Sequence, residues 1–228
     1  MVLEQQKYIE KNPSDGRYRL GLKLFELGRK AVSRFDLREK SRPFLERLVF
    51  ETGETVHLCI LDGAEVVYMD KVEPERSVRM ASRIGSRTPA YCTSVGKAIM
   101  AYLSAPQVEN ILRVHGLKPR TQHTIHSVIE MKNELKKVRE QGFAVDNEEN
   151  EEGVRCVGCV VRGATGEPVA AISVSGPAFR VAANKLADLA RPVKTAAIEL
   201  SMELGFHKEL DNNHNIKSQM VPWTSAQA

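Results

Sequence analysis

The sequence lacks any apolar run long enough to cross a membrane. Its longest apolar runs, at residues 156–161 and 169–174, are far shorter than the roughly 20 residues that a spanning helix needs. No charged and then apolar leader opens the chain, so no export signal is predicted. We therefore expect a cytoplasmic protein that does not contact a membrane.

Cysteine and excess charge are also scarce. The 228 residues include only four cysteines, which a cytosolic protein would keep reduced, so no disulfide framework is expected. A hydrophobic content of 42% and a charged content of 27% are ordinary for a globular chain and exclude a disordered or fibrous one. The net charge of +4 permits contact with nucleic acid but does not demand it.

The sequence has few residues arranged to bind a metal ion. Cys156 and Cys159 form a single Cys-x-x-Cys pair, and positions three apart in a strand point to opposite faces. We therefore interpret both as small buried hydrophobes. A zinc site would need further ligands, for which the candidates are His57, Cys59, Cys92 and Asp146. No metal and no cofactor are expected.

The N-terminal residues predict a β-hairpin. Residues 7–11 and 17–20 alternate in polarity around the turn residues 12–16, a pattern typical of two paired strands. A lone hairpin is not stable in water and must pack on a partner. Its basic residues suit a wing that contacts phosphates, although a solvated edge hairpin explains them equally well. These residues are Lys7, Lys11, Arg17, Arg19 and Lys23.

The rest of the chain alternates between helical and strand-like patterns, which indicates an α+β fold. A stripe at helical spacing, formed by Leu20, Leu24, Leu27, Ala31 and Phe35, predicts a first helix that must bury against another surface. Further helices are predicted at residues 36–51, 94–103, 104–115, 127–142 and 181–204, the last with a kink or break at Pro192. Strands are predicted at residues 55–61, 65–72, 78–81, 143–145, 154–161 and 168–175. Residues 207–228 lack periodicity and are predicted to form a disordered tail.

The segment from Asp146 to Pro177 carries most of the candidate chemistry. Strand alternation places Ser173 and Ser175 on one face. Two hydroxyls beside an acidic loop could line a small polar pocket, and a solvated edge strand is the alternative. Within that loop we expect residues 148–152 to lie mostly on the surface, partly neutralised by Arg155.

The start of the helix at Ser94 is a second candidate site. Exposed amides and a hydroxyl at a helix start can hold a carboxylate, although an ordinary cap on Thr93 or Ser94 explains the residues as well. Ser94 and Lys97 also match the Ser-x-x-Lys pattern of serine acyl-enzymes. The companion Ser-Asp-Asn is absent, and Lys194-Thr195-Ala196 does not provide the usual Lys-Thr-Gly. A Ser94/Lys97 hydrolase therefore stays an alternative function.

Several blocks together resemble the IclR-type bacterial transcriptional regulators. They are GRYRLG at 16–21, ETVHL at 54–58, SVGKA at 94–98, GFAVDNEE at 142–149, GVRC at 153–156 and AAISVSGP at 170–177. The blocks follow the order of the family and cover roughly residues 8–206. No block is decisive alone, but the ordered set is specific.

The resemblance implies a GAF-like (profilin-like) effector-binding domain, with helices flanking a curved antiparallel sheet. It implies no catalysis and a pocket for a small organic acid. Residues 79–85 and 146–153 look most like regulators of pectin and hexuronate breakdown, which favours a 2-keto-3-deoxygluconate-like acid. By position, the pocket would be lined by Ser94, Val95, Asp146, Cys156, Ser173 and Ser175, with cover from Met80 and Thr88. Family members commonly have Gly or Ala where this chain has Ser94 and Val95.

The resemblance also implies a domain order. Residues 1–20 would be the wing remnant of a winged helix-turn-helix, 21–35 a linker and dimerisation helix, 36–206 the effector-binding domain and 207–228 the tail. Family members carry a complete winged helix-turn-helix before the hairpin, so we expect the full protein to bind DNA as a homodimer or homotetramer and to act as a repressor. A sensor or oligomerisation protein without DNA binding is the remaining alternative.

Overall fold

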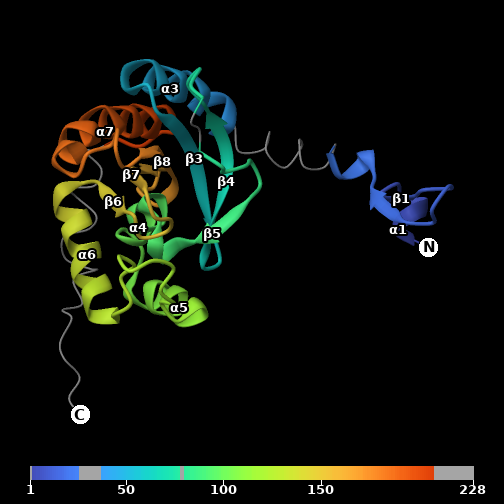
Figure 1. The fold of residues 1–228 in the computed structure, drawn as a ribbon, viewed down its shortest axis with the longest axis horizontal. Helices are drawn as coiled ribbons and strands as arrows, with labels where there is room; N and C mark the ends of the chain where they lie inside the picture. The colour runs from blue at the N-terminus through green and yellow to red at the C-terminus, as the bar shows by residue number, and fades with distance from the viewer. Residues whose placement is uncertain (1, 26–36, 78–79, 208–228) are drawn as a thin grey trace, which may run out of the picture. The chain divides into compact units, whose positions relative to one another are not determined.

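A computed structural model describes residues 2–25, 37–77 and 80–207, and the chain divides into two compact units, 1–40 and 41–228 (Figure 1). In the smaller unit, strands β1 (Ile9–Lys11) and β2 (Tyr18–Leu20) pair as the predicted antiparallel hairpin. A four-residue helix that the sequence did not indicate, α1 (Val2–Gln5), precedes them. Of the proposed linker helix, positions 26–36 lie outside the described residues, as do 208–228 of the proposed tail.

The larger unit is built on a six-stranded antiparallel sheet in the order β5-β4-β3-β8-β7-β6. Its strands are β3 (Thr55–Asp62), β4 (Glu65–Val72), β5 (Arg87–Pro89), β6 (Ala144–Asn147), β7 (Val154–Arg162) and β8 (Pro168–Pro177). The Asp62-Gly63 turn joins β3 to β4, the strands predicted at residues 55–61 and 65–72, with Gly63 at φ +63°. That positive φ suits glycine and explains why the turn forms there.

One predicted strand is wrong in its described part. Met80 and Ala81 are not in a strand, while 78 and 79 lie outside the described residues. The edge strand is instead β5, which pairs with β4 so that Pro89 lies opposite Glu65. The Met80 carbonyl has a side-chain partner in place of a strand, because it accepts a hydrogen bond from the Lys71 ammonium group.

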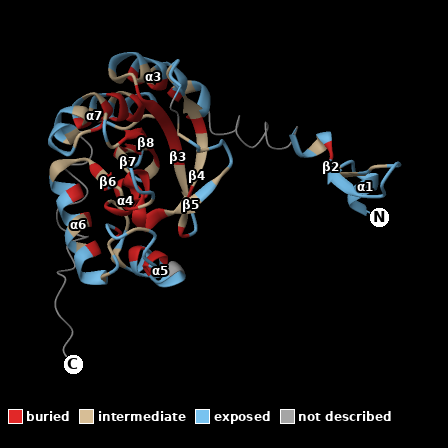
Figure 2. Ribbon diagram, in the orientation of Figure 1, coloured by how far each residue is buried: buried red, intermediate tan, exposed pale blue. Residues whose placement is uncertain are grey.

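Five α-helices flank the sheet (Figure 1): α3 (Leu37–Thr52), α4 (Ser94–Met100), α5 (Ala105–His115), α6 (Val128–Gln141) and α7 (Leu186–Glu203). We call the face of the sheet that carries Gly158 the inner face, and α4 packs on it. Helices α3 and α7 lie on the opposite, outer face. There Arg42 of α3 pairs with Asp70, and the charge of Lys194 of α7 lowers the pKa of Cys159. An ion pair between Arg47 and Glu199 joins the two helices. The buried residues therefore concentrate on both sides of the sheet (Figure 2).

The capping signals place most helix ends correctly. Thr93 caps α4 by accepting a hydrogen bond from the Gly96 amide at 3.1 Å, and Ser127 caps α6. Of the kink or break predicted at Pro192, the break does not occur, because α7 continues through Pro192; the helix begins at Leu186. Proline removes one helical hydrogen bond, but the burial of Val193, Ala197 and other small residues on the sheet offsets that loss.

Candidate functional site

Three neighbouring strands bring four of the predicted site residues together. Asp146 of β6 pairs with Cys156 of β7, which pairs with Ser175 of β8. Directly opposed residues in an antiparallel ladder lie on the same face. Ser173 is two positions from Ser175 and opposes Gly158, so all four side chains lie on the inner face. The polar groups of the acidic loop and the serine strand thus share one wall.

Helix α4 begins directly over this wall. A Cβ atom on Gly158 would lie 2.8 Å from the carbonyl carbon of Ser94 and 3.0 Å from the Val95 nitrogen. Only a glycine leaves room for this approach of helix to strand. Ser94 and Val95 are both buried there, next to the row of polar groups. Thr93 rather than Ser94 is the cap.

The two cysteines of the Cys-x-x-Cys pair occupy opposite faces, as predicted. Cys159 is buried on the outer face, and burial raises the pKa of its thiol to about 12. Cys156 stays partly exposed on the inner face and shares a hydrogen bond with Ser175. Its pKa is raised well above the ordinary value by burial and by the charge of Asp146. The interpretation of both cysteines as buried hydrophobes is therefore confirmed for Cys159, whereas Cys156 is of intermediate exposure.

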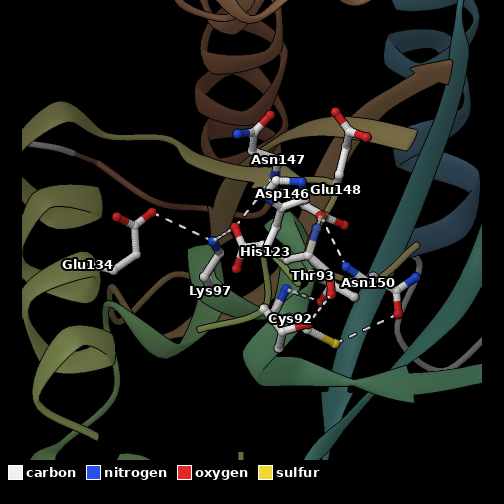
Figure 3. A network of polar contacts seen from close by, with 12 residues as sticks. Cys92, Thr93, Lys97, His123, Glu134, Asp146, Asn147, Glu148 and Asn150 are labelled. Atoms are coloured by element: carbon white, nitrogen blue, oxygen red, sulfur yellow. Dashed lines mark hydrogen bonds and ion pairs between the residues drawn. The ribbon is translucent and has the colours of Figure 1, made fainter. Parts of the chain in front are cut away.

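Asp146 shapes the loop that follows it. Its Oδ1 accepts hydrogen bonds from the Glu149 amide at 2.8 Å and from the Asn150 amide at 3.3 Å (Figure 3). The side chain is only 3% exposed. Burial raises the pKa of Asp146 to about 7, with a further rise from Glu149 and an opposing effect from Lys97. Near neutral pH this carboxyl group can therefore either donate or accept a hydrogen bond.

A buried ion pair lies behind Asp146. Lys97 of α4 is 0% exposed, and its Nζ lies 2.5 Å from Glu149 Oε1 and 3.6 Å from Glu134 Oε1 (Figure 3). The expectation that residues 148–152 lie mostly on the surface is thus wrong for Glu149, because Lys97 needs a counter-charge in the interior. Glu148 does pair with Arg155, at 2.7 Å, as expected. A lysine within an otherwise apolar helix was the signal for this burial.

The same ion pair bears on the hydrolase alternative. A base next to a serine nucleophile must be free to accept its proton. The Lys97 ammonium group is instead bound by two carboxylates, Glu149 and Glu134. This arrangement fits a structural charge better than a catalytic one.

His57 is an inner-face residue that the sequence indicated only as a possible zinc ligand. His57 opposes Ser173, and its Nδ1 lies 3.4 Å from Ser175 Oγ. Its Nε2 lies 2.7 Å from Ser82 Oγ, and its ring packs edge-on against Tyr68 with centroids 5.0 Å apart. Burial, together with the charge of Lys71, lowers the pKa of His57 to about 3, so the ring is neutral. The alternation of strand β3 was the signal that could have placed it there.

The two predicted cover residues lie at the β4–β5 side of the site. Thr88 of β5 is half-buried and hydrogen-bonds the Tyr68 hydroxyl. Met80 is half-buried, and its carbonyl accepts a hydrogen bond from Lys71 Nζ at 2.7 Å. The charges of Cys156 and Asp146 influence the pKa of Tyr68, which places this side of the site close to the polar wall.

The four basic residues proposed to contact DNA all lie exposed on the hairpin of the smaller unit: Lys7, Lys11, Arg17 and Arg19. They are not equivalent. Arg19 pairs with Glu10 at 2.8 Å, which neutralises it locally. Lys11 lies 5.9 Å from the centre of the Tyr18 ring.

Two further features limit what the site can do. Within the described ranges, no group of three or more metal-binding side chains comes together. None of the helices in the part of the chain that the structure describes is long and apolar enough to span a membrane.

A curled antiparallel sheet with helices, carrying hydroxyl, thiol and carboxyl groups on its inner face, defines an α+β small-molecule-binding domain. Residues 29–202 match the family described as bacterial transcriptional regulator IclR, C-terminal. The chain belongs to the IclR family of bacterial transcriptional regulators.

Relatives and solved structures agree with this assignment. The chain is 39% identical to the transcriptional regulator XynR of Escherichia coli K12 over 90% of this chain and 81% of XynR. It is 37% identical to KdgR of the same organism over 88% of this chain and 76% of KdgR. The crystal structure of Thermotoga maritima IclR is 40% identical, with a TM-score of 0.77 over 90% of this chain and 83% of that one. The C-terminal domain of E. coli KdgR is 34% identical, with a TM-score of 0.68 over 75% of this chain and 99% of that domain.

The family membership confirms the predicted resemblance, the α+β effector domain and a role in transcription regulation. The protein is a ligand-responsive transcriptional regulator rather than an enzyme, which sets the hydrolase alternative aside.

Proposed function

We propose that the inner face of the larger unit binds a small hydroxylated organic acid, of the 2-keto-3-deoxygluconate type, and that binding changes the affinity of the protein for DNA. The observation that carries the proposal is the single polar wall formed by Asp146, Cys156, Ser173 and Ser175 under α4. Serine hydroxyls can donate to and accept from the hydroxyl and carbonyl oxygens of a sugar acid. Ser94 and Val95 close the wall above, and Met80 and Thr88 flank it.

Asp146 suits an acidic ligand for a specific reason. Its pKa of about 7 lets it keep a proton near neutral pH and donate a hydrogen bond to a ligand oxygen. Lys97, the nearby cation, is already bound by Glu149. The ligand would therefore be held by hydroxyl and carboxyl groups, which favours a polyhydroxylated acid over a highly charged anion. The likeness of residues 79–85 and 146–153 to regulators of hexuronate breakdown supports the same class.

The smaller unit contributes to DNA binding in this proposal. Lys7, Lys11, Arg17 and Arg19 lie on the exposed hairpin of residues 1–20 and would contact phosphates as a wing. Residues 21–35 would link and dimerise the chains, and 36–206 would sense the effector. The protein would act in the cytoplasm as a homodimer or homotetramer. An effector acts by binding one arrangement of the subunits more tightly than another.

Thermal unfolding with candidate acids tests the proposal. The wild-type protein is screened against 2-keto-3-deoxygluconate, galacturonate, pyruvate and 4-hydroxybenzoate. A ligand at a hundredfold excess over its Kd stabilises the fold by about 2.7 kcal/mol, which raises Tm measurably. Asp146→Ala and Ser175→Ala should remove most of that rise, because each deletes the group that would contact the ligand. The matched control is Glu152→Ala, because Glu152 is an exposed carboxylate of the same loop. If no acid stabilises the wild type, or if Asp146→Ala responds like Glu152→Ala, the proposed site is wrong.

A further inference from the structure

The segment of residues 80–86 crosses the inner face of the sheet. Lys71 points to this face because it opposes His57 across β3 and β4. Its Nζ donates to the carbonyl of Met80 at 2.7 Å and to that of Ser82 at 2.8 Å. The charge is balanced by Glu73 at 2.9 Å. Residues 80–82 are thus held at β3 and β4, and β3 is the direct neighbour of β8, which carries Ser173 and Ser175.

Ser82 reaches from this segment into the site itself. Its hydroxyl lies 2.7 Å from His57 Nε2, and the other ring nitrogen lies 3.4 Å from Ser175 Oγ. The neutral ring has one donor and one acceptor nitrogen. When the nitrogen that faces Ser82 donates, the nitrogen that faces Ser175 must accept, and the reverse holds for the other tautomer. Ser175 in turn hydrogen-bonds Cys156. A chain of polar contacts therefore runs from the covering segment to the polar wall.

The remainder of the segment is held by the turn between Arg83 and Ser86, in which the Ser86 hydroxyl donates to the Arg83 carbonyl at 2.6 Å, and not by buried side chains. Ala81, Arg83 and Ile84 are exposed. At the far end of the segment, the Gly85 amide donates a hydrogen bond to the Tyr68 carbonyl at 2.8 Å. The Tyr68 amide donates one to the Ser86 carbonyl at 3.1 Å. Gly85 has φ +83° and nothing within 4 Å of its Cβ direction. A segment with exposed side chains and a glycine at its end opens more easily than the sheet beneath it.

We propose that the Ser82–His57 hydrogen bond is a latch that holds residues 80–86 closed over the effector site, and that its release opens the route to the polar wall. His57 acts as a positioning residue, since its ring contacts Ser82 of the segment on one side and Ser175 of the polar wall on the other. The inference rests on the proposed function for its biological meaning. The hydrogen bonds that carry it are those of the protein without ligand, and the first test uses no ligand.

The two cysteines on opposite faces of β7 supply that test. Cys156 lies on the inner face, where it opposes Ser175, the contact of His57, while Cys159 lies on the outer face and is buried. The full-length chain is treated with iodoacetamide, and the alkylation rate of each cysteine is followed by peptide mass spectrometry. Ser82→Ala should raise the rate at Cys156 about threefold to tenfold, the range for loss of one neutral hydrogen bond. Cys159 should keep its rate.

Matched variants separate a latch from a general loss of stability. Ser82→Thr keeps the hydroxyl and should react like the wild type. His57→Gln places a side-chain nitrogen near the position of Nε2 and should keep the latch, whereas His57→Asn is too short to reach Ser82 and should release it. An unchanged Cys156 rate in Ser82→Ala overturns the proposal. So does an equal rise at Cys156 and Cys159, because global unfolding exposes both.

The ligand arm then links the latch to binding. If one of the screened acids stabilises the protein, Ser82→Ala should speed both its association and its dissociation, measured by stopped-flow fluorescence or surface plasmon resonance. Unchanged rates would show that the segment does not gate the site. If none of the acids binds, the proposed function fails while the alkylation result still decides whether the latch exists.

Discussion

Glu149 joins Lys97 to Asp146 through two different groups. Its side-chain Oε1 lies 2.5 Å from Lys97 Nζ, and its backbone amide donates to Asp146 Oδ1 at 2.8 Å. The loop after β6 is thereby fixed to helix α4 at the point where both border the candidate effector site. The other oxygen, Glu149 Oε2, is buried and has no partner within the described residues. The position of Asp146 consequently depends on a charge pair in the interior.

Lys97→Met should therefore destabilise the protein strongly. It leaves the Glu149 carboxylate buried without its cation, which costs about 3–5 kcal/mol. The double variant Lys97→Met with Glu149→Met removes both charges, and such replacements are often neutral. Urea unfolding followed by circular dichroism measures the three free energies of unfolding. If the double variant is no more stable than Lys97→Met, the buried pair does not account for the loss.

Asp146 should make stability fall as the pH rises. Its pKa is about 7 in the folded protein, whereas the ordinary value of 3.8 applies to the unfolded chain. Between these two pH values the folded state therefore binds more protons than the unfolded state. The contribution of Asp146 is full below about pH 4 and is lost as the pH rises through about 7. The free energy of unfolding of the wild type relative to Asp146→Asn, measured from pH 4 to 8, should decline over that window. A flat difference would mean that burial does not raise this pKa.

Gly158→Ala should displace α4 from the sheet. The added Cβ would lie 2.8 Å from the Ser94 carbonyl carbon, and overpacking of this kind typically costs about 1–3 kcal/mol. Thermal unfolding should show a lower Tm, and binding of any identified effector should weaken because Ser94 and Val95 move. Ser173→Ala, at the position that opposes Gly158, adds no atoms and is the control for stability. Equal Tm values for Gly158→Ala and the wild type would contradict the close contact.

The hairpin should contribute to DNA affinity through unpaired charges. Arg17 is exposed, whereas Arg19 is paired with Glu10. Arg17→Gln should weaken binding to duplex DNA and reduce the salt slope of log K by about one. Arg19→Gln should have a smaller effect, since Glu10 already offsets its charge. Fluorescence anisotropy at several salt concentrations measures both, and equal slopes for wild type and Arg17→Gln would exclude this arginine from the interface.

Local patterns were enough to predict most of the elements. The strands near residues 55–61 and 65–72, the helices near 104–115 and 127–142 and the alternation around Ser173 depend on neighbours in the chain, and the structure has them close to where they were expected. The wrong strand at Met80 and the absence of a break at Pro192 have a different origin. In each case a tertiary interaction, the Lys71 hydrogen bond or the packing of α7, overrides the local preference.

The sequence by itself determined the family, the order of helices and strands and the shared face of Ser173 and Ser175, because periodicity and short motifs record local geometry. Only the tertiary structure decided that Glu149 is buried against Lys97, 52 residues away, and that His57 meets Ser82, 25 residues away. Burial of a charge and the partner of a neutral imidazole depend on which strands become neighbours and on how closely α4 approaches Gly158. No local pattern encodes these distances, so the side chains that hold Asp146 and cover the site emerged only from the folded chain.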